Sequence, residues 1–150
     1  MKPKQFLIPF LLISFILVLS ASYQLDFKSQ TELNVTQMRI EFDGLDATAT
    51  IDYDVGFLTQ MYAFFIGSRN LVPYLEDFLY GYEEFQIISV RGTTATVELP
   101  NSSRISSSYY LHDSRELGST VPTLLMVYPD AEKTFIYYNV SATQNTNTVI

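Results

Sequence analysis

The chain has 150 residues, a formal net charge of −7 and no cysteine. This length suggests one domain, and the missing cysteines exclude disulfides, thiol nucleophiles and thiolate metal sites. The acidic excess, which no stripe of lysine or arginine offsets, argues against nucleic acid and anionic lipid surfaces as partners.

The first 22 residues have the pattern of an export signal. Two lysines precede an apolar run at 6–19, and Ser20 and Ser22 supply the small side chains expected before a signal cleavage site. The run is short for a membrane-spanning helix, which needs ~20 apolar residues. We therefore expect cleavage after Ser22, with a retained membrane anchor at 1–22 as the alternative. In both cases the basic N-terminus stays inside, so the protein is secreted or anchored on the outer side of the cytoplasmic membrane.

Two alternating segments follow a polar stretch at 23–32, which we interpret as a linker. In residues 38–42, and again in residues 47–55, apolar and polar side chains alternate with the period of a half-buried strand. A glycine-containing turn at 43–46 stands between them. The pattern predicts a β-hairpin.

Two helices are predicted after this hairpin. Residues 57–66 place apolar side chains at helical spacing and end before Gly67, a favourable residue at a helix C-terminus. Asn70 can cap a second helix over 70–82, and Pro73 is tolerated in its first turn. Each helix has an apolar stripe that can pack on a sheet.

Strands dominate the remainder of the chain. The segments 85–90 and 95–99 predict a second hairpin, and the segments 124–128 and 134–140 predict a third across a Pro-Asp turn. A serine-rich exposed loop and a short strand lie between these hairpins. The polar residues 141–150 predict a flexible tail.

The order of these elements, ββααββββ, predicts an α+β fold. Clustered strands favour a mainly antiparallel sheet of about six strands, with the two helices packed on one of its faces. This single domain spans residues 33–140 and follows the N-terminal signal or anchor helix.

His112 is the only histidine, so any imidazole base would have to be this residue. Its neighbours have a simpler interpretation, because Asp113 and Glu116 stand at the spacing of a helix-capping pair before Leu117 and Gly118. No nucleophile elbow or phosphate-binding glycine loop is present. The sequence therefore predicts a protein that is not an enzyme and has no cofactor.

Four aspartates offer oxygen ligands. Asp52 and Asp54 share the outer face of one predicted strand, and Asp43 and Asp46 lie in the adjoining turn. Such a cluster could hold Ca²⁺, or supply an acid and a base for hydrolysis. A solvated acidic face explains the same residues and is the interpretation that we favour.

Three Asn-x-Ser/Thr sequons are candidates for glycosylation in an exported protein. They begin at Asn101, Asn34 and Asn139. Asn101 is the best of the three because it falls in the serine-rich loop.

Two adjacent tyrosine pairs lie on predicted strands. They are Tyr109–Tyr110 and Tyr137–Tyr138, and alternation along a strand turns one member of each pair outward. Exposed tyrosine is ordinary in sheets, but it can also stack on sugars or anchor a protein partner.

These features together predict an acidic, exported cell-envelope or secreted protein that works by interaction rather than catalysis. Other envelope proteins or glycans are the expected partners, and the membrane is contacted only through an uncleaved N-terminal segment. The alternatives are a small carbohydrate- or Ca²⁺-binding module and, less favoured, a hydrolase that uses two carboxylates.

Overall fold

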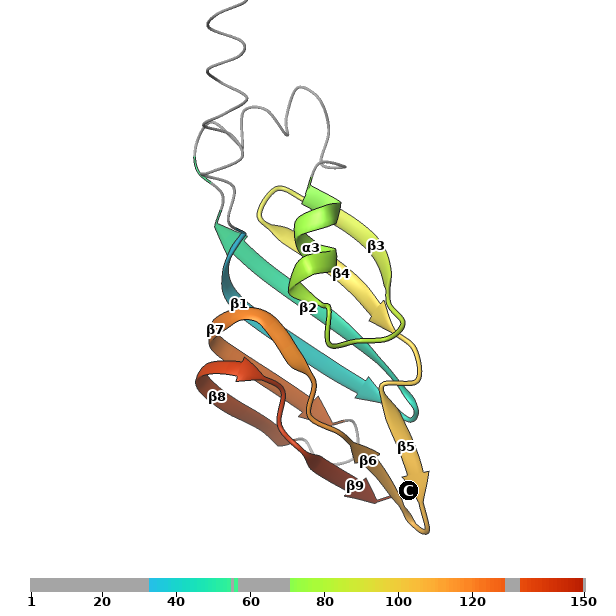
Figure 1. Cartoon of the computed structure of the whole chain (residues 1–150). Helices are drawn as coiled ribbons and strands as arrows, with labels where there is room; N and C mark the ends of the chain where they lie inside the picture. Colours follow the sequence, from blue (N-terminus) through green and yellow to red (C-terminus); the bar gives the residue numbers. More distant parts are fainter. Residues whose placement is uncertain (1–32, 55, 57–70, 129–132, 150) are drawn as a thin grey trace, which may run out of the picture. The chain divides into compact units, whose positions relative to one another are not determined.

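The chain divides into two units, Met1–Glu32 and Leu33–Ile150. The computed structural model describes only residues of the second unit (Figure 1). These are residues 33–54, 56, 71–128 and 133–149.

Several expectations therefore lie outside the described residues. They are the export signal at 1–22 with its cleavage after Ser22, the linker at 23–32, and the helix at 57–66. In the part of the chain that is described, no helix is long and apolar enough to span a membrane.

The described residues form nine strands and one short helix. The strands are β1 (Asn34–Asp43), β2 (Asp46–Asp54), β3 (Gln86–Arg91), β4 (Thr94–Leu99), β5 (Ser103–Ser106), β6 (Tyr109–His112), β7 (Glu116–Tyr128), β8 (Lys133–Ala142) and β9 (Thr146–Val149). The helix is α3 (Val72–Phe78).

The predicted α+β fold is wrong, because 67% of the described residues lie in strands. The second predicted helix shrinks to the seven residues of α3, which begins after Leu71 without a side-chain cap. The ββααββββ order also fails, because short polar strands replace the expected loop and tail. These strands, β5 and β9, are rich in serine, threonine and asparagine, and they lack the apolar alternation that marks a strand in a sequence.

Six strands form a mixed sheet in the order β3-β4-β2-β1-β7-β8. The predicted hairpins β1–β2, β3–β4 and β7–β8 are present and antiparallel. The additional contact is the parallel pair β1–β7, whose register runs from Gln37 opposite Thr123 to Glu41 opposite Val127. This pair places the C-terminal hairpin beside the N-terminal one.

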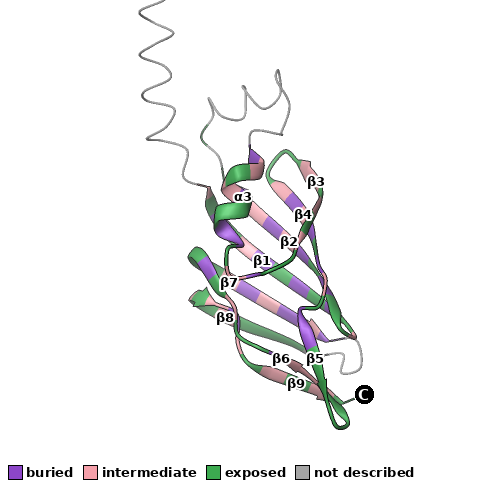
Figure 2. Ribbon diagram, turned by 45° about the vertical axis from the view of Figure 1, so that its right-hand side comes forward, coloured by how far each residue is buried: buried purple, intermediate pink, exposed green. Residues whose placement is uncertain are grey.

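One face of this sheet carries the core (Figure 2). Buried side chains stand opposite each other across four strands, for example Val97, Ala49, Ile40 and Met126. The period of two turns the intervening threonines and charged residues to the other face. Leu75, Phe78 and Leu79, in or just after α3, belong to the same buried cluster.

A second sheet of three strands, in the order β5-β6-β9, also packs against the core. His112 of β6 contacts the ring of Phe42 in β1. Thr146 of β9 shares a hydrogen bond with the hydroxyl of Tyr128 in β7. In the chain β6 is followed by β7 and β8 by β9, and β7 pairs with β8 while β6 pairs with β9. These four strands therefore form one bent two-stranded ribbon that passes from the large sheet into the small one.

Two glycines allow the backbone of β7 to lie directly against the segment that contains α3. A Cβ atom on Gly118 would come within 2.5 Å of the carbonyl oxygen of Asp77 and 2.9 Å of the Cα atom of Phe78. A Cβ atom on Gly81 would lie 2.2 Å from the carbonyl oxygen of Glu116. Close backbone contact therefore requires glycine at both positions.

We expect Gly118→Ala to destabilise the protein by about 1–3 kcal/mol, because the neighbouring backbone must move to accommodate a methyl group. Gly56→Ala is the matched control, since no atom of the described residues lies within 4 Å of its added Cβ. Denaturant unfolding of both variants measures the difference. Equal stabilities would show that β7 and α3 are not in close contact.

Candidate functional site

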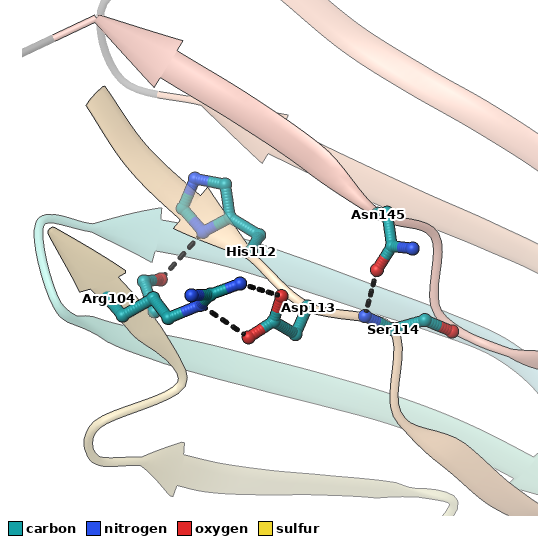
Figure 3. A network of polar contacts seen from close by, with 6 residues as sticks. Arg104, His112, Asp113, Ser114 and Asn145 are labelled. Atoms are coloured by element: carbon teal, nitrogen blue, oxygen red, sulfur yellow. Dashed lines mark hydrogen bonds and ion pairs between the residues drawn. The ribbon is translucent and has the colours of Figure 1, made fainter. Parts of the chain in front are cut away.

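The bend of the ribbon surrounds His112 (Figure 3). Its Nδ1 lies 2.6 Å from Ser103 Oγ, and its Nε2 lies 3.2 Å from Thr148 Oγ1. The ring centroid is 4.0 Å from that of Phe42 and 5.2 Å from that of Tyr128. The side chain is thus buried between the two sheets, with both ring nitrogens engaged by hydroxyl groups.

This arrangement does not match a nucleophilic triad. In a triad the second nitrogen of the histidine faces a carboxylate, which orients the ring and stabilises its charged form. The nearby carboxylate of Asp113 instead accepts two hydrogen bonds from Arg104, at 2.9 and 3.2 Å. Burial lowers the pKa of His112, so the ring is neutral at pH 7 and acts as a packing and hydrogen-bonding group.

The expected capping pair of Asp113 and Glu116 is wrong, because Glu116 begins strand β7 rather than a helical turn. The hydrogen bonds from Arg104 hold the pKa of Asp113 below its usual value. The carboxylate of Glu116 accepts a hydrogen bond from the hydroxyl of Tyr80. The residues at 113–115 form the corner between β6 and β7, and Glu116 to Gly118 begin β7.

Side chains fix this corner on both strands of the ribbon. The amide of Ser114 donates to the side-chain oxygen of Asn145 (Figure 3). The amide of Arg115 donates to Thr143 Oγ1. The Ser114 hydroxyl donates to the carbonyl of Thr143, whose own amide donates to the carbonyl of Arg115. Where the ribbon bends, these bonds take the place of the regular backbone hydrogen bonds between its two strands.

The protein should lose stability on acidification below about pH 6.5. An unfolded histidine binds a proton near its ordinary pKa of 6.5, whereas the buried ring binds one only at lower pH. Below pH 6.5 the unfolded state therefore binds more protons than the folded state. The stability that the neutral His112 contributes is complete above pH 6.5 and falls as the pH drops. Denaturant unfolding at pH 7.5 and 5.0 measures this change in the free energy of unfolding. His112→Asn should reduce the pH dependence, and an unchanged dependence would contradict the assignment.

The four candidate aspartates do not form one cluster. Asp43 and Asp46 face each other at the β1–β2 turn, whereas Asp52 and Asp54 lie near the far end of β2. Asp52 lies six positions after Asp46 along the strand, a distance of roughly 20 Å. Asp46 accepts the amide of Asn101, and Asp52 accepts the hydroxyl of Thr94. Among the described residues, no group of three or more acidic or histidine side chains could hold a metal ion.

All three sequon asparagines are exposed. Asn34 begins β1, Asn101 lies in the turn between β4 and β5, and Asn139 lies within β8. Asn101 and Asn139 both have a positive φ, of 52° and 54°, which asparagine tolerates better than most residues. Asn139 stands opposite Pro122, where β7 lacks an amide for the ladder.

The tyrosine pairs belong to different sheets. Tyr109 is exposed on β6, and Tyr110 packs its ring against Gly44 of the β1–β2 turn. Tyr138 on β8 is 68% exposed, and Tyr137 is partly buried against the core. The two outward tyrosines therefore do not form a common binding platform within one sheet.

A pocket of about 250 Å³ lies beside the corner of the ribbon. Arg115 lines it, and the Nε atom of that residue is buried without a hydrogen-bond partner among the described residues. Burial raises the pKa of Tyr82, also in the lining, to about 12. Glu83 and Glu84 bring negative charge to the same pocket as the positive charge of Arg115. The lining therefore does not select a ligand of one charge.

The most distinctive surface is the edge of the large sheet at β8. Phe135 is 44% exposed and Ile136 is 49% exposed, although both lie in the middle of a strand. Phe135 stands opposite the buried Met126, so it lies on the core face, whereas Ile136 lies on the other face opposite Leu125. The sequence interpretation singled out the tyrosines here and missed these two residues. The sequence feature that could have identified this surface is that no charged residue occurs from Thr134 to Ile150.

Comparison of the chain with protein-family models, with curated proteins and with solved structures gives no match. The function must therefore be argued from the residues and their arrangement.

Proposed function

We propose that this chain is an exported, non-enzymatic interaction protein that accepts an extended polypeptide segment as an additional strand beside β8. The observation that carries the proposal is the edge of the large sheet at β8, which is long, apolar and unpaired within the described part of the chain.

The backbone of β8 can template another strand. β8 is the last strand of the six-stranded sheet, and its partner in that sheet is β7. From Lys133 to Tyr138 it runs opposite β7 in unbroken register, a stretch of roughly 20 Å. Alternate amide and carbonyl groups of an edge strand point away from the sheet, where an extended segment can pair with them.

The side chains of β8 define the chemistry of its partner. Phe135 is exposed on one face and Ile136 and Tyr138 are exposed on the other, so an added strand meets apolar groups on both sides. Neither β7 from Leu117 onward nor β8 after Lys133 carries a charged residue. An uncharged segment rich in β-branched or aromatic residues fits this edge best.

The opposite edge of the sheet is protected in the way that natural edges usually are. β3 has only six residues, ends in Arg91, and shifts register between Ile87 and Ser89. Short length, charge and bulges all discourage further pairing. β8 has ten residues, and its only charged residue is Lys133 at the first position. The difference between the two edges favours β8, rather than β3, as the edge that accepts an added strand.

Two observations support an exported protein that is not an enzyme. The basic residues, apolar run and small residues of 1–22 have the order of an export signal. His112 uses both ring nitrogens in hydrogen bonds to hydroxyl groups, away from any carboxylate that could orient it as a base. The tyrosine-bearing β8 edge then provides the means of interaction.

Strand addition can be tested with a library of ten-residue displayed peptides selected against the full chain. We expect binders that are uncharged and rich in β-branched or aromatic residues, and that protect the amides of β8 from hydrogen exchange. Ile136→Lys should weaken their binding at least tenfold, because a cation at this position opposes the buried apolar contact. Ile88→Lys on β3 is a matched control, since both isoleucines are 49% exposed at an edge of the same sheet.

Each alternative result has a definite meaning. Peptides that bind Ile136→Lys as well as wild type, or that protect β3 instead of β8, would contradict the proposal. A selection that yields no peptide protecting β8 would contradict it as well.

A further inference from the structure

We infer that the strand accepted at the β8 edge is β8 of a second copy of this chain. Two domains then pair antiparallel across a two-fold axis, and their six-stranded sheets become one continuous sheet. The inference rests on the proposed function and specifies the partner. Three properties of β8 support it: its symmetry, its charge and its side chains.

An edge strand can pair with itself only in certain registers. A two-fold axis perpendicular to the sheet makes the two strands antiparallel and keeps the core faces of both domains on the same side. A residue of the first copy must then oppose a residue on the same face of the second. One residue of β8 therefore lies on the axis and opposes its own counterpart. The regular stretch Lys133–Tyr138 is long enough to be centred on any residue near its middle.

Charge favours a second copy at this edge over other surfaces of the domain. The chain has a net charge of −7, so two copies repel each other wherever acidic residues approach. β8 contains no acidic residue, and none occurs from Thr134 to Ile150. Outward-facing carboxylates lie on β1, β2 and β4, which are separated from this edge by β7. The strand β8 itself therefore adds no acidic repulsion between two copies, and the nearest acidic residues in the sequence, Asp130 and Glu132, precede Lys133.

The side chains also complement themselves. In the antiparallel pair, Phe135 meets core-face residues of the partner's strand, such as its own counterpart or Tyr137. With Ile136 at the axis, Phe135 opposes Tyr137 of the second copy, Ile136 opposes its own counterpart, and Tyr138 opposes Thr134. Phe135 and Ile136 are then each covered by an apolar or aromatic side chain, which matches the cross-strand pairing that stabilises sheets.

The first measurement is sedimentation equilibrium of the full chain over micromolar to millimolar concentrations. We expect a monomer–dimer equilibrium, with the dissociation constant of Ile136→Lys raised at least tenfold and that of Ile88→Lys unchanged. Both positions are half-exposed in the single copy, and circular dichroism checks that each variant is folded.

The second measurement uses the absence of cysteine, because any disulfide in a single-cysteine variant must join two copies. Cysteine is placed in turn at each position from 134 to 138, and the rate of cross-linking is measured under mild oxidation. Only the residue on the two-fold axis faces its counterpart at the distance that a disulfide requires. At neighbouring positions the two sulfurs are displaced by two residues along the strands. We therefore expect one sharp maximum.

The outcomes separate this inference from the proposed function. A chain that stays monomeric at millimolar concentration, or that cross-links equally at all five positions, overturns self-pairing. A dimer that Ile136→Lys leaves intact overturns it too. If such a chain still binds strand-forming peptides at β8, strand addition stands and only the identity of the partner is wrong. If it binds neither peptides nor itself at β8, both proposals fail.

Discussion

The parallel contact between β1 and β7 is the constraint on which the rest of the structure depends. Parallel neighbours cannot be joined by a tight turn, so a long connection must leave β1 and return to β7. The described part of that connection contains β2, α3 and four further strands. Because β1 and β7 share a register in which Met38 opposes Leu124 and Ile40 opposes Met126, their apolar faces turn to the same side. One core then serves both ends of the chain.

The same contact determines where the C-terminal ribbon can go. With β7 beside β1, the next strand along the chain, β8, becomes the edge of the sheet. The first part of β7 lies on the backbone at the end of α3, and Gly118 makes room for this contact. The ribbon bends at 113–115, so β6 and β9 lie over Phe42 and Tyr128. His112 is buried by this bend, where both of its ring nitrogens contact hydroxyl groups.

Much of the first half of the sheet could be predicted from local pattern. The alternation in β1 and β2 is regular because one face is buried and the other is solvated along the whole hairpin. The β3–β4 hairpin follows from the same rule and from the turn at Gly92. The helix-like interpretation of 113–118 failed because aspartate, serine and glycine are also corner residues. The hydrogen bonds that decide between these readings come from Thr143 and Asn145, almost thirty residues away.

The absence of thiol chemistry, the acidic charge, the export-like pattern of 1–22 and the β-hairpins whose faces differ in polarity all follow from the sequence. These are properties of composition and of neighbouring residues. The burial of His112 and the position of β8 at the edge of a sheet emerge only from the folded structure, because an apolar strand has the same sequence whether it lies inside a sheet or at its border. Its exposure depends on which strands pair across long distances in the chain.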